Sequence, residues 1–232
     1  MKPSKLLRLL VPLVLSLSVA GCSGLLRSNA QPVQVYTLRA DDASSNGAAD
    51  PSPAQAQAQA LSLRVAHPLA GPGLNTSQIV LLQPDHRMNV YAASAWAADA
   101  PALIESLATQ TLRASGKWRS VEDAESPFPS DDLLQISIRR FDADYSAGSD
   151  TPPTVHVTLD CTLGAEDGRT ILASFVADGS AMAAANKLSG VVAAFQQATD
   201  QALGSMAQQA SASVRRPSER TVGPRSRQRA RK

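Results

Sequence analysis

The chain has 232 residues, of which 44% are hydrophobic and 18% charged, and this composition excludes a wholly disordered protein. Its net charge of +2 is unevenly distributed. The first eight residues contribute +3 and the residues after 214 contribute +7, which leaves −8 for the body. The positive charge therefore belongs to the two ends and gives no reason to expect a protein that binds nucleic acid.

The first 22 residues have the layout of a bacterial lipoprotein signal. Lys2, Lys5 and Arg8 precede an apolar run at 9–20, the small residues at 19–21 follow, and Cys22 ends the segment. The run is shorter than the ~20 apolar residues that span a bilayer. We predict a signal peptide at 1–21 and acylation of Cys22, with palmitate among the acyl chains. The alternative is an ordinary signal peptide that ends near a cysteine.

The residue after Cys22 bears on the destination of the protein. Aspartate at this position resembles an inner-membrane retention signal in many Gram-negative bacteria, and Ser23 does not match it. We therefore expect a lipid anchor in the inner leaflet of the outer membrane, with the protein facing the periplasm. A tether at 22–32, a domain at 33–209 with a flexible insertion at 40–60, and a basic disordered tail at 210–232 complete the expected organisation.

The first half of the expected domain contains short strands and one helix. Alternating patterns predict strands at 33–38 and 61–66, and a hairpin at 78–82 and 88–91. The helix is expected to begin at Asp99 or Ala100, with Pro101 in its first turn, and to end at Gly116. A strand at 117–121 follows.

The second half contains longer strands and a second helix. Strands are expected at 133–141, 154–163 and 169–176, with an Asp-Gly turn between the last two. An apolar stripe from Leu188 to Met206 then predicts a helix. The order predicts an α+β fold (an α/β two-layer domain), with a mainly antiparallel or mixed sheet covered by two helices.

Sequence motifs for catalysis or metal binding are lacking. The chain has no nucleophile elbow, zinc motif, P-loop or dinucleotide fingerprint, and its three histidines are dispersed. Cys161 lies on the apolar side of an alternating strand, which indicates a buried small hydrophobe rather than a redox or metal ligand. We expect no enzymatic activity, no catalytic residues, no cofactor and no metal.

Several blocks in chain order carry a resemblance to a known family. They are Tyr36-Thr37-Leu38, the segment 68–79 (PLAGPGLNTSQI), Val90-Tyr91 followed by Trp96-Ala97, and 115–118 (SGKW) after a leucine-rich helix. In this order behind a lipoprotein signal, they resemble the ABC-type transport auxiliary lipoprotein family, the PqiC-like partners of MCE (mammalian cell entry) systems. The insertion at 40–60 and the basic tail lie outside the matching blocks.

The resemblance implies a non-enzymatic role in lipid transport between membranes. The partners would be the membrane, through lipidated Cys22, and a periplasmic MCE-domain protein that works with an ABC permease and ATPase. A homo-oligomer, such as a ring of several copies, is also compatible with the resemblance, and nucleic acid is not expected. We place the partner-binding surface near Pro72, Gly73, Tyr91 and Trp96, although a tryptophan at position 96 is also compatible with core packing.

Two other classes of function stay open at this point. A general envelope adaptor that binds peptidoglycan or an assembly machine would share the lipid anchor and the sheet. A periplasmic lipoprotein hydrolase would need a triad assembled in space, which sequence spacing does not reveal. The basic tail is expected to be a solvated extension or to contact an anionic surface such as lipid headgroups.

Overall fold

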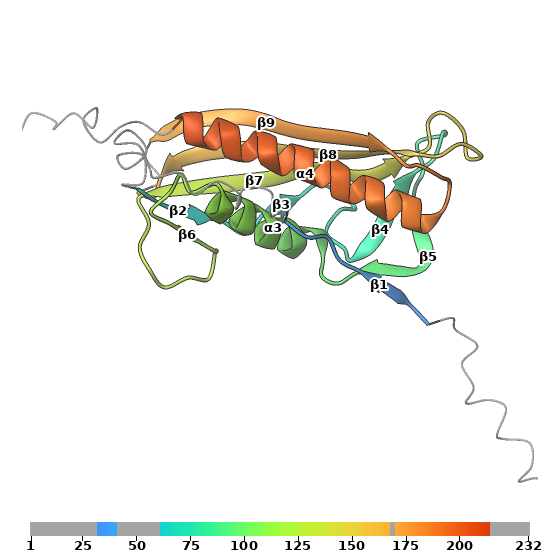
Figure 1. The fold of residues 1–232 in the computed structure, drawn as a ribbon, viewed down its shortest axis with the longest axis horizontal. Helices are drawn as coiled ribbons and strands as arrows, with labels where there is room; N and C mark the ends of the chain where they lie inside the picture. Colours follow the sequence, from blue (N-terminus) through green and yellow to red (C-terminus); the bar gives the residue numbers. More distant parts are fainter. Residues whose placement is uncertain (1–31, 41–60, 168–169, 214–232) are drawn as a thin grey trace, which may run out of the picture. The chain divides into compact units, whose positions relative to one another are not determined.

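The computed structural model describes residues 32–40, 61–167 and 170–213. The signal segment, Cys22, most of the tether, nearly all of the 40–60 insertion and the tail from residue 214 lie outside these ranges. In the described part, nine strands form one mixed sheet accompanied by two helices (Figure 1). The strands are β1 (Gln34–Tyr36), β2 (Ser62–Val65), β3 (Leu69–Ala70), β4 (Gln78–Leu82), β5 (Met88–Trp96), β6 (Ser120–Glu122), β7 (Asp132–Asp144), β8 (Thr154–Ala165) and β9 (Ile171–Met182).

Strand β7 joins the two halves of the sheet. Along one edge it pairs antiparallel with β8, which pairs antiparallel with β9. Along its other edge, β2, β3 and β4 pair with it one after another, each in the parallel direction. Strand β5 pairs with β4, β1 pairs with β5, and β6 pairs with β2. The expected mixed sheet is confirmed.

The two helices are α3 (Ala100–Ala114) and α4 (Leu188–Ser213), and both pack against one side of the sheet (Figure 1). Helix α3 begins as expected, because the Asp99 side chain accepts a hydrogen bond from the Ala102 N–H at 3.0 Å. Gly116, with φ of +61°, follows its last turn. The two-layer α+β architecture is confirmed.

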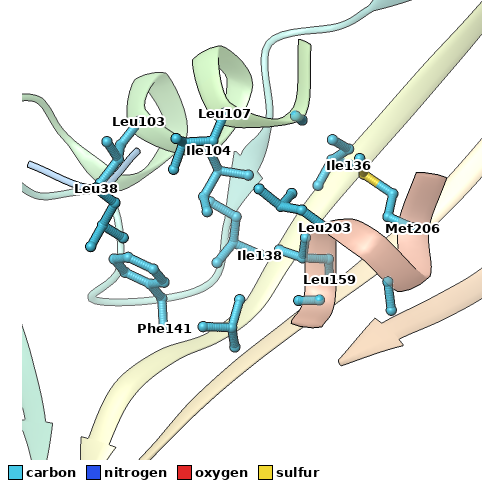
Figure 2. Close-up of a cluster of buried hydrophobic side chains, with 14 of the residues drawn as sticks. Leu38, Leu103, Ile104, Leu107, Ile136, Ile138, Phe141, Leu159, Leu203 and Met206 are labelled. Atoms are coloured by element: carbon cyan, nitrogen blue, oxygen red, sulfur yellow. The ribbon is translucent and has the colours of Figure 1, made fainter. Parts of the chain in front are cut away.

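The core lies between this side of the sheet and the helices. Alternate residues of β8 from Val155 to Leu163 are buried, and Leu38, Ile104 and Leu203 join them from other elements (Figure 2). Cys161 is 2% exposed, as expected for a small buried hydrophobe. Its burial, with a smaller contribution from the Asp160 charge, raises the pKa of the thiol to about 12.

Helix α4 approaches β9 unusually closely. A Cβ atom added at Gly179 would overlap the carbonyl oxygen of Ala198 and lie 2.9 Å from the backbone nitrogen of Ala202. Two glutamines of α4 also bond to the backbone of β9. The Gln201 side chain accepts from the Ser180 N–H at 3.1 Å, and Gln209 donates to the Val176 carbonyl at 3.0 Å.

Several elements differ in length from the sequence expectation. Strand β5 continues to Trp96 because β1 pairs with its last residues. Strand β9 continues to Met182 because α4 covers its small residues. Helix α4 reaches Ser213, past the domain end expected at 209. The two-residue strand β3 lies between β2 and β4, where no strand was expected.

Candidate docking groove

The loop at 71–76 carries half of the longest sequence block noted above, and hydrogen bonds attach it firmly to the rest of the fold. The Gly71 N–H donates to the Ile138 carbonyl of β7 at 3.0 Å, and the Leu74 N–H closes a turn onto the Gly71 carbonyl at 3.0 Å. Leu74 is 4% exposed and anchors the loop in the core. The Thr76 carbonyl accepts from the Ala100 N–H at 3.1 Å, which joins the loop to the start of α3.

Glycine is favoured at position 73 by the backbone, because its φ of +79° lies in a region that other residues rarely adopt. A Cβ atom there would lie 2.5 Å from the sulfur of the flexible Met88 side chain, which would have to shift. The loop therefore sits directly against the first residue of β5.

The hairpin between β4 and β5 forms the other side. The Gln83 N–H donates to the Arg87 carbonyl at 2.9 Å, and His86 adopts a φ of 64° at the turn. Arg87 Nε donates to the Asp85 carboxylate at 2.6 Å. The expected hairpin is confirmed.

Loop and hairpin together enclose a shallow groove of about 470 Å³. Val80 is 3% exposed, while Met88 and Val90 are 47% and 39% exposed. Asn75 and Asn89 supply amide groups along the same groove. The groove combines an apolar surface with amide groups that can fix the orientation of a bound segment. This combination is typical of a surface that binds another protein.

Tyr91 follows the groove residue Val90 in β5, and its hydroxyl connects β5 to distant parts of the chain. Its hydroxyl is 2.9 Å from the Tyr145 hydroxyl, which donates to the Asn186 side-chain oxygen at 2.8 Å. Burial, and then the hydrogen bond to Tyr145, raise the pKa of Tyr91 well above its ordinary value. The half-buried ring of Tyr91 thus has a hydroxyl already engaged within the protein.

Trp96 does not lie on the surface. It is 2% exposed, and its ring packs against Phe141 and Phe195 at centroid distances of 5.7 and 5.1 Å. Its position on β5 turns it to the helix side of the sheet, as the burial of Ser94 two residues earlier also shows. The expectation that Trp96 contacts a partner directly is therefore wrong for this conformation, and its alternative, core packing, is correct.

The other three residues predicted to bind a partner keep some exposure. Pro72 and Gly73 are exposed on the loop, and Tyr91 is half-buried on β5. Met88 and Val90 line the groove together with Gly73, although neither was among the predicted partner-binding residues. Two apolar residues alternating along an exposed hairpin strand, Met88 and Val90, were the available signal.

The described residues contain no group of three or more His, Cys, Asp or Glu side chains arranged to hold a metal ion. Neither α3 nor α4, the helices found there, has the length and hydropathy required to cross a bilayer.

Comparison with solved structures identifies the fold. Protein XCC0632 from Xanthomonas campestris matches with a TM-score of 0.65 and 23% identity, over 79% of this chain and 96% of that chain. An uncharacterised protein matches with a TM-score of 0.58 and 14% identity, over 77% and 99%. A PelC dodecamer from Paraburkholderia phytofirmans gives a TM-score of 0.38 and 17% identity, over 62% and 86%.

A family-level comparison covers most of the domain. No curated protein matches the chain. The family described as the ABC-type transport auxiliary lipoprotein component matches residues 36–207, which include the loop, the hairpin, α3 and most of α4. By this match, the chain belongs to the ABC-type transport auxiliary lipoprotein component family.

Proposed function

We propose that the protein is a non-enzymatic, lipid-anchored component of an intermembrane lipid transport system and docks a periplasmic MCE-domain protein at the outer membrane. The observation that carries the proposal is the family match over residues 36–207. The lipoprotein signal ending at Cys22 supports an anchor, and Ser23 supports the outer membrane as its location. The boundaries at 1–21, 22–32 and 33–209 remain part of this proposal.

The groove between the 71–76 loop and the β4–β5 hairpin is the docking surface in this proposal. Its exposed apolar residues, Met88 and Val90, supply area that a partner would bury. Bonds to β7 and α3 hold the loop in place before binding, so docking requires little ordering of the backbone. Gly73 lines this surface, Pro72 and Tyr91 adjoin lining residues in the sequence, and Trp96 packs in the core at the other end of β5.

Site-specific crosslinking in intact cells tests the proposal. A photo-reactive amino acid is placed at Asn75 or Asn89 in the groove, in a tagged and lipidated chain. The matched control carries it at Ser174, which is exposed on β9. Captured proteins are identified by mass spectrometry after detergent extraction.

The proposal expects an MCE-domain protein to be captured from the groove positions and not from Ser174. Met88→Lys should lower this capture at least tenfold, because binding would bury a charge. Capture of peptidoglycan-linked or assembly proteins without an MCE component would replace the proposal by a general envelope adaptor. Equal capture from the groove and from Ser174 would remove the groove as the docking surface.

A further inference from the structure

The first half of β5 has no neighbour on one side of the sheet. Strand β5 lies between β4 and β1, and β1 pairs only with residues 94–96 of β5. Among the described residues, no strand pairs with 88–93 on the β1 side. Two features oppose a longer β1 ladder: Ala93 has a φ of 50°, and Pro32 lacks an N–H group. The sheet edge beside the docking groove is therefore open.

The pairing with β4 determines which backbone groups face this edge. Opposite residues of antiparallel strands alternate between pairs that exchange hydrogen bonds and pairs that do not. The Leu82 carbonyl accepts from the Tyr145 N–H on the β7 side at 2.9 Å, so Leu82 and the opposite residue Met88 form a pair without hydrogen bonds. Val80 and Val90, two positions further along, form the next such pair. The N–H and C=O groups of Met88 and Val90 therefore point to the open edge.

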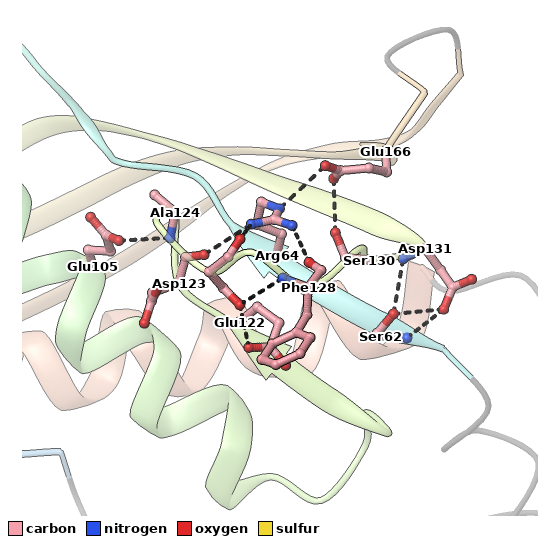
Figure 3. Close-up of polar contacts among 11 residues, drawn as sticks. Ser62, Arg64, Glu105, Glu122, Asp123, Ala124, Phe128, Ser130, Asp131 and Glu166 are labelled. Carbon is pink, nitrogen blue, oxygen red and sulfur yellow. Dashed lines mark hydrogen bonds and ion pairs between the residues drawn. The ribbon is translucent and has the colours of Figure 1, made fainter.

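Elsewhere, helix side chains bond to the backbone at or beside the outer strands. Gln196 of α4 accepts from the Arg39 N–H at 3.0 Å and donates to the Arg39 carbonyl at 2.7 Å, just after β1. Glu105 of α3 accepts from the Ala124 N–H at 3.1 Å, just after β6 (Figure 3). Two glutamines of α4 bond to β9 in the same way. Within the described ranges, no such bond reaches the open edge of β5.

The side chains at the open edge are suited to an added strand. Met88 and Val90 alternate along β5, are 47% and 39% exposed, and line the groove. Native proteins usually protect sheet edges with charged residues, proline or a covering element, because an open edge pairs with other chains. Residues 88–92 contain neither charge nor proline. A strand added here would satisfy the free backbone groups and place alternate side chains beside Met88 and Val90.

We propose that the partner docks by β-strand addition, in which an extended segment of the MCE-domain protein pairs with β5 at residues 88–90. This inference rests on the proposed function and adds the manner of binding. An extended segment is the ligand that can bond the N–H and C=O groups of both Met88 and Val90 at their spacing. The uncharged edge favours an apolar segment over the chain's own end, which carries seven arginines and one lysine after residue 214.

Hydrogen exchange tests the open edge in the protein alone. The mature lipidated protein is studied in detergent micelles, and amide exchange rates are measured by NMR and corrected for their intrinsic rates. The Met88 and Val90 amides should exchange at least about tenfold faster than the Asn89 amide, which faces Leu81 of β4 in a bonded pair. Equal protection of the three amides would show that the edge is not open and would overturn the proposal.

Proline at position 90 tests strand addition in intact cells. Val90→Pro removes the outward N–H and leaves the bonded pair of Asn89 and Leu81 in place. Val90→Ile is the matched control, because it keeps both the N–H and an apolar side chain. Capture of the MCE-domain protein from a photo-reactive residue at Asn75 should fall about tenfold in Val90→Pro and stay within about twofold in Val90→Ile. Circular dichroism checks that both variants are folded.

A second measurement decides the question if Val90→Pro loses its fold. In the purified complex with the unsubstituted chain, the Met88 and Val90 amides should become as protected as the Asn89 amide. Fast exchange of both amides in the complex would overturn strand addition.

The outcomes separate this inference from the proposed function. Equal capture in folded Val90→Pro and Val90→Ile would overturn strand addition and leave the proposed function in place. Failure to capture an MCE-domain protein with the unsubstituted chain would overturn the proposed function, and this inference with it. Crosslinks from Asn75 to a second copy, or to residues 23–31 of the same chain, in place of the MCE-domain protein would overturn the assignment of the partner.

Discussion

Replacing Gly179 by alanine should destabilise the fold by a predictable amount. The added methyl group would overlap the Ala198 carbonyl and lie 2.8 Å from Gln201 Cβ and 2.9 Å from Ala202 N. Two of these three atoms belong to the α4 backbone, so rotation of a side chain cannot relieve the overlap. Helix α4 must move away from β9, which separates a well-packed interface.

The expected magnitude follows from two opposing effects. Overpacking of a rigid core costs ~1–3 kcal/mol, and a clash with helix backbone places this site at the upper end. In the opposite direction, alanine has less conformational entropy than glycine in the unfolded chain, which increases the free energy of unfolding by ~0.4–1 kcal/mol. The net loss should be about 2 kcal/mol, which lowers the melting temperature of a domain of this size by about 4–8 °C.

The matched control is Gly204→Ala on α4, where an added Cβ meets nothing within 4 Å. This substitution should stabilise the helix by ~0.5–1 kcal/mol. Urea denaturation of the mature protein, followed by circular dichroism, measures both changes. An unchanged midpoint for Gly179→Ala would refute the close approach of α4 to β9.

Three further predictions concern other parts of the fold. Trp96→Ala should lower the free energy of unfolding measured in urea by ~3–5 kcal/mol. The control Val35→Ala, at a residue 65% exposed, should change it by no more than ~0.5 kcal/mol. Similar values for the two variants would contradict core packing of Trp96. Since the pKa of the Cys161 thiol is raised to about 12, the protonated form persists at pH 8, and a thiol reagent should label it about a thousandfold more slowly in the folded than in the urea-unfolded protein. Comparable labelling rates would show that the thiol is not buried. Asp99→Ala should cost ~1 kcal/mol through loss of the α3 cap, and an unchanged denaturation midpoint would show that the 3.0 Å bond contributes nothing.

Local sequence signals predicted the elements that begin or end at capping, proline or glycine residues, or that show a clear alternation of apolar residues. Asp99 before Pro101, and Gly116 after the last turn, located α3 almost to the residue. The alternation from Val155 to Leu163 predicted both β8 and the buried position of Cys161. These features depend on a few neighbouring residues, which the sequence displays directly.

Other features depend on contacts between distant residues. The second half of β9 contains Ala177, Asp178 and Gly179, which have low strand propensity, and it is extended because α4 packs on it. Likewise, no motif links Glu105 with Ala124 or His67, because only the packing of α3 beside β6 brings them together. The burial of Trp96 was left between two alternatives for the same reason.

The glutamines at the edge of the sheet limit how copies of this chain can associate. Strand β9 pairs with β8 on one side, and on the other its Ser180 N–H and Val176 carbonyl are bonded to Gln201 and Gln209. An incoming strand would need these same two groups for its own ladder. Continuation of the sheet from one molecule into the next at β9 therefore requires α4 to release both bonds, and side-by-side assembly with α4 in place must use other surfaces.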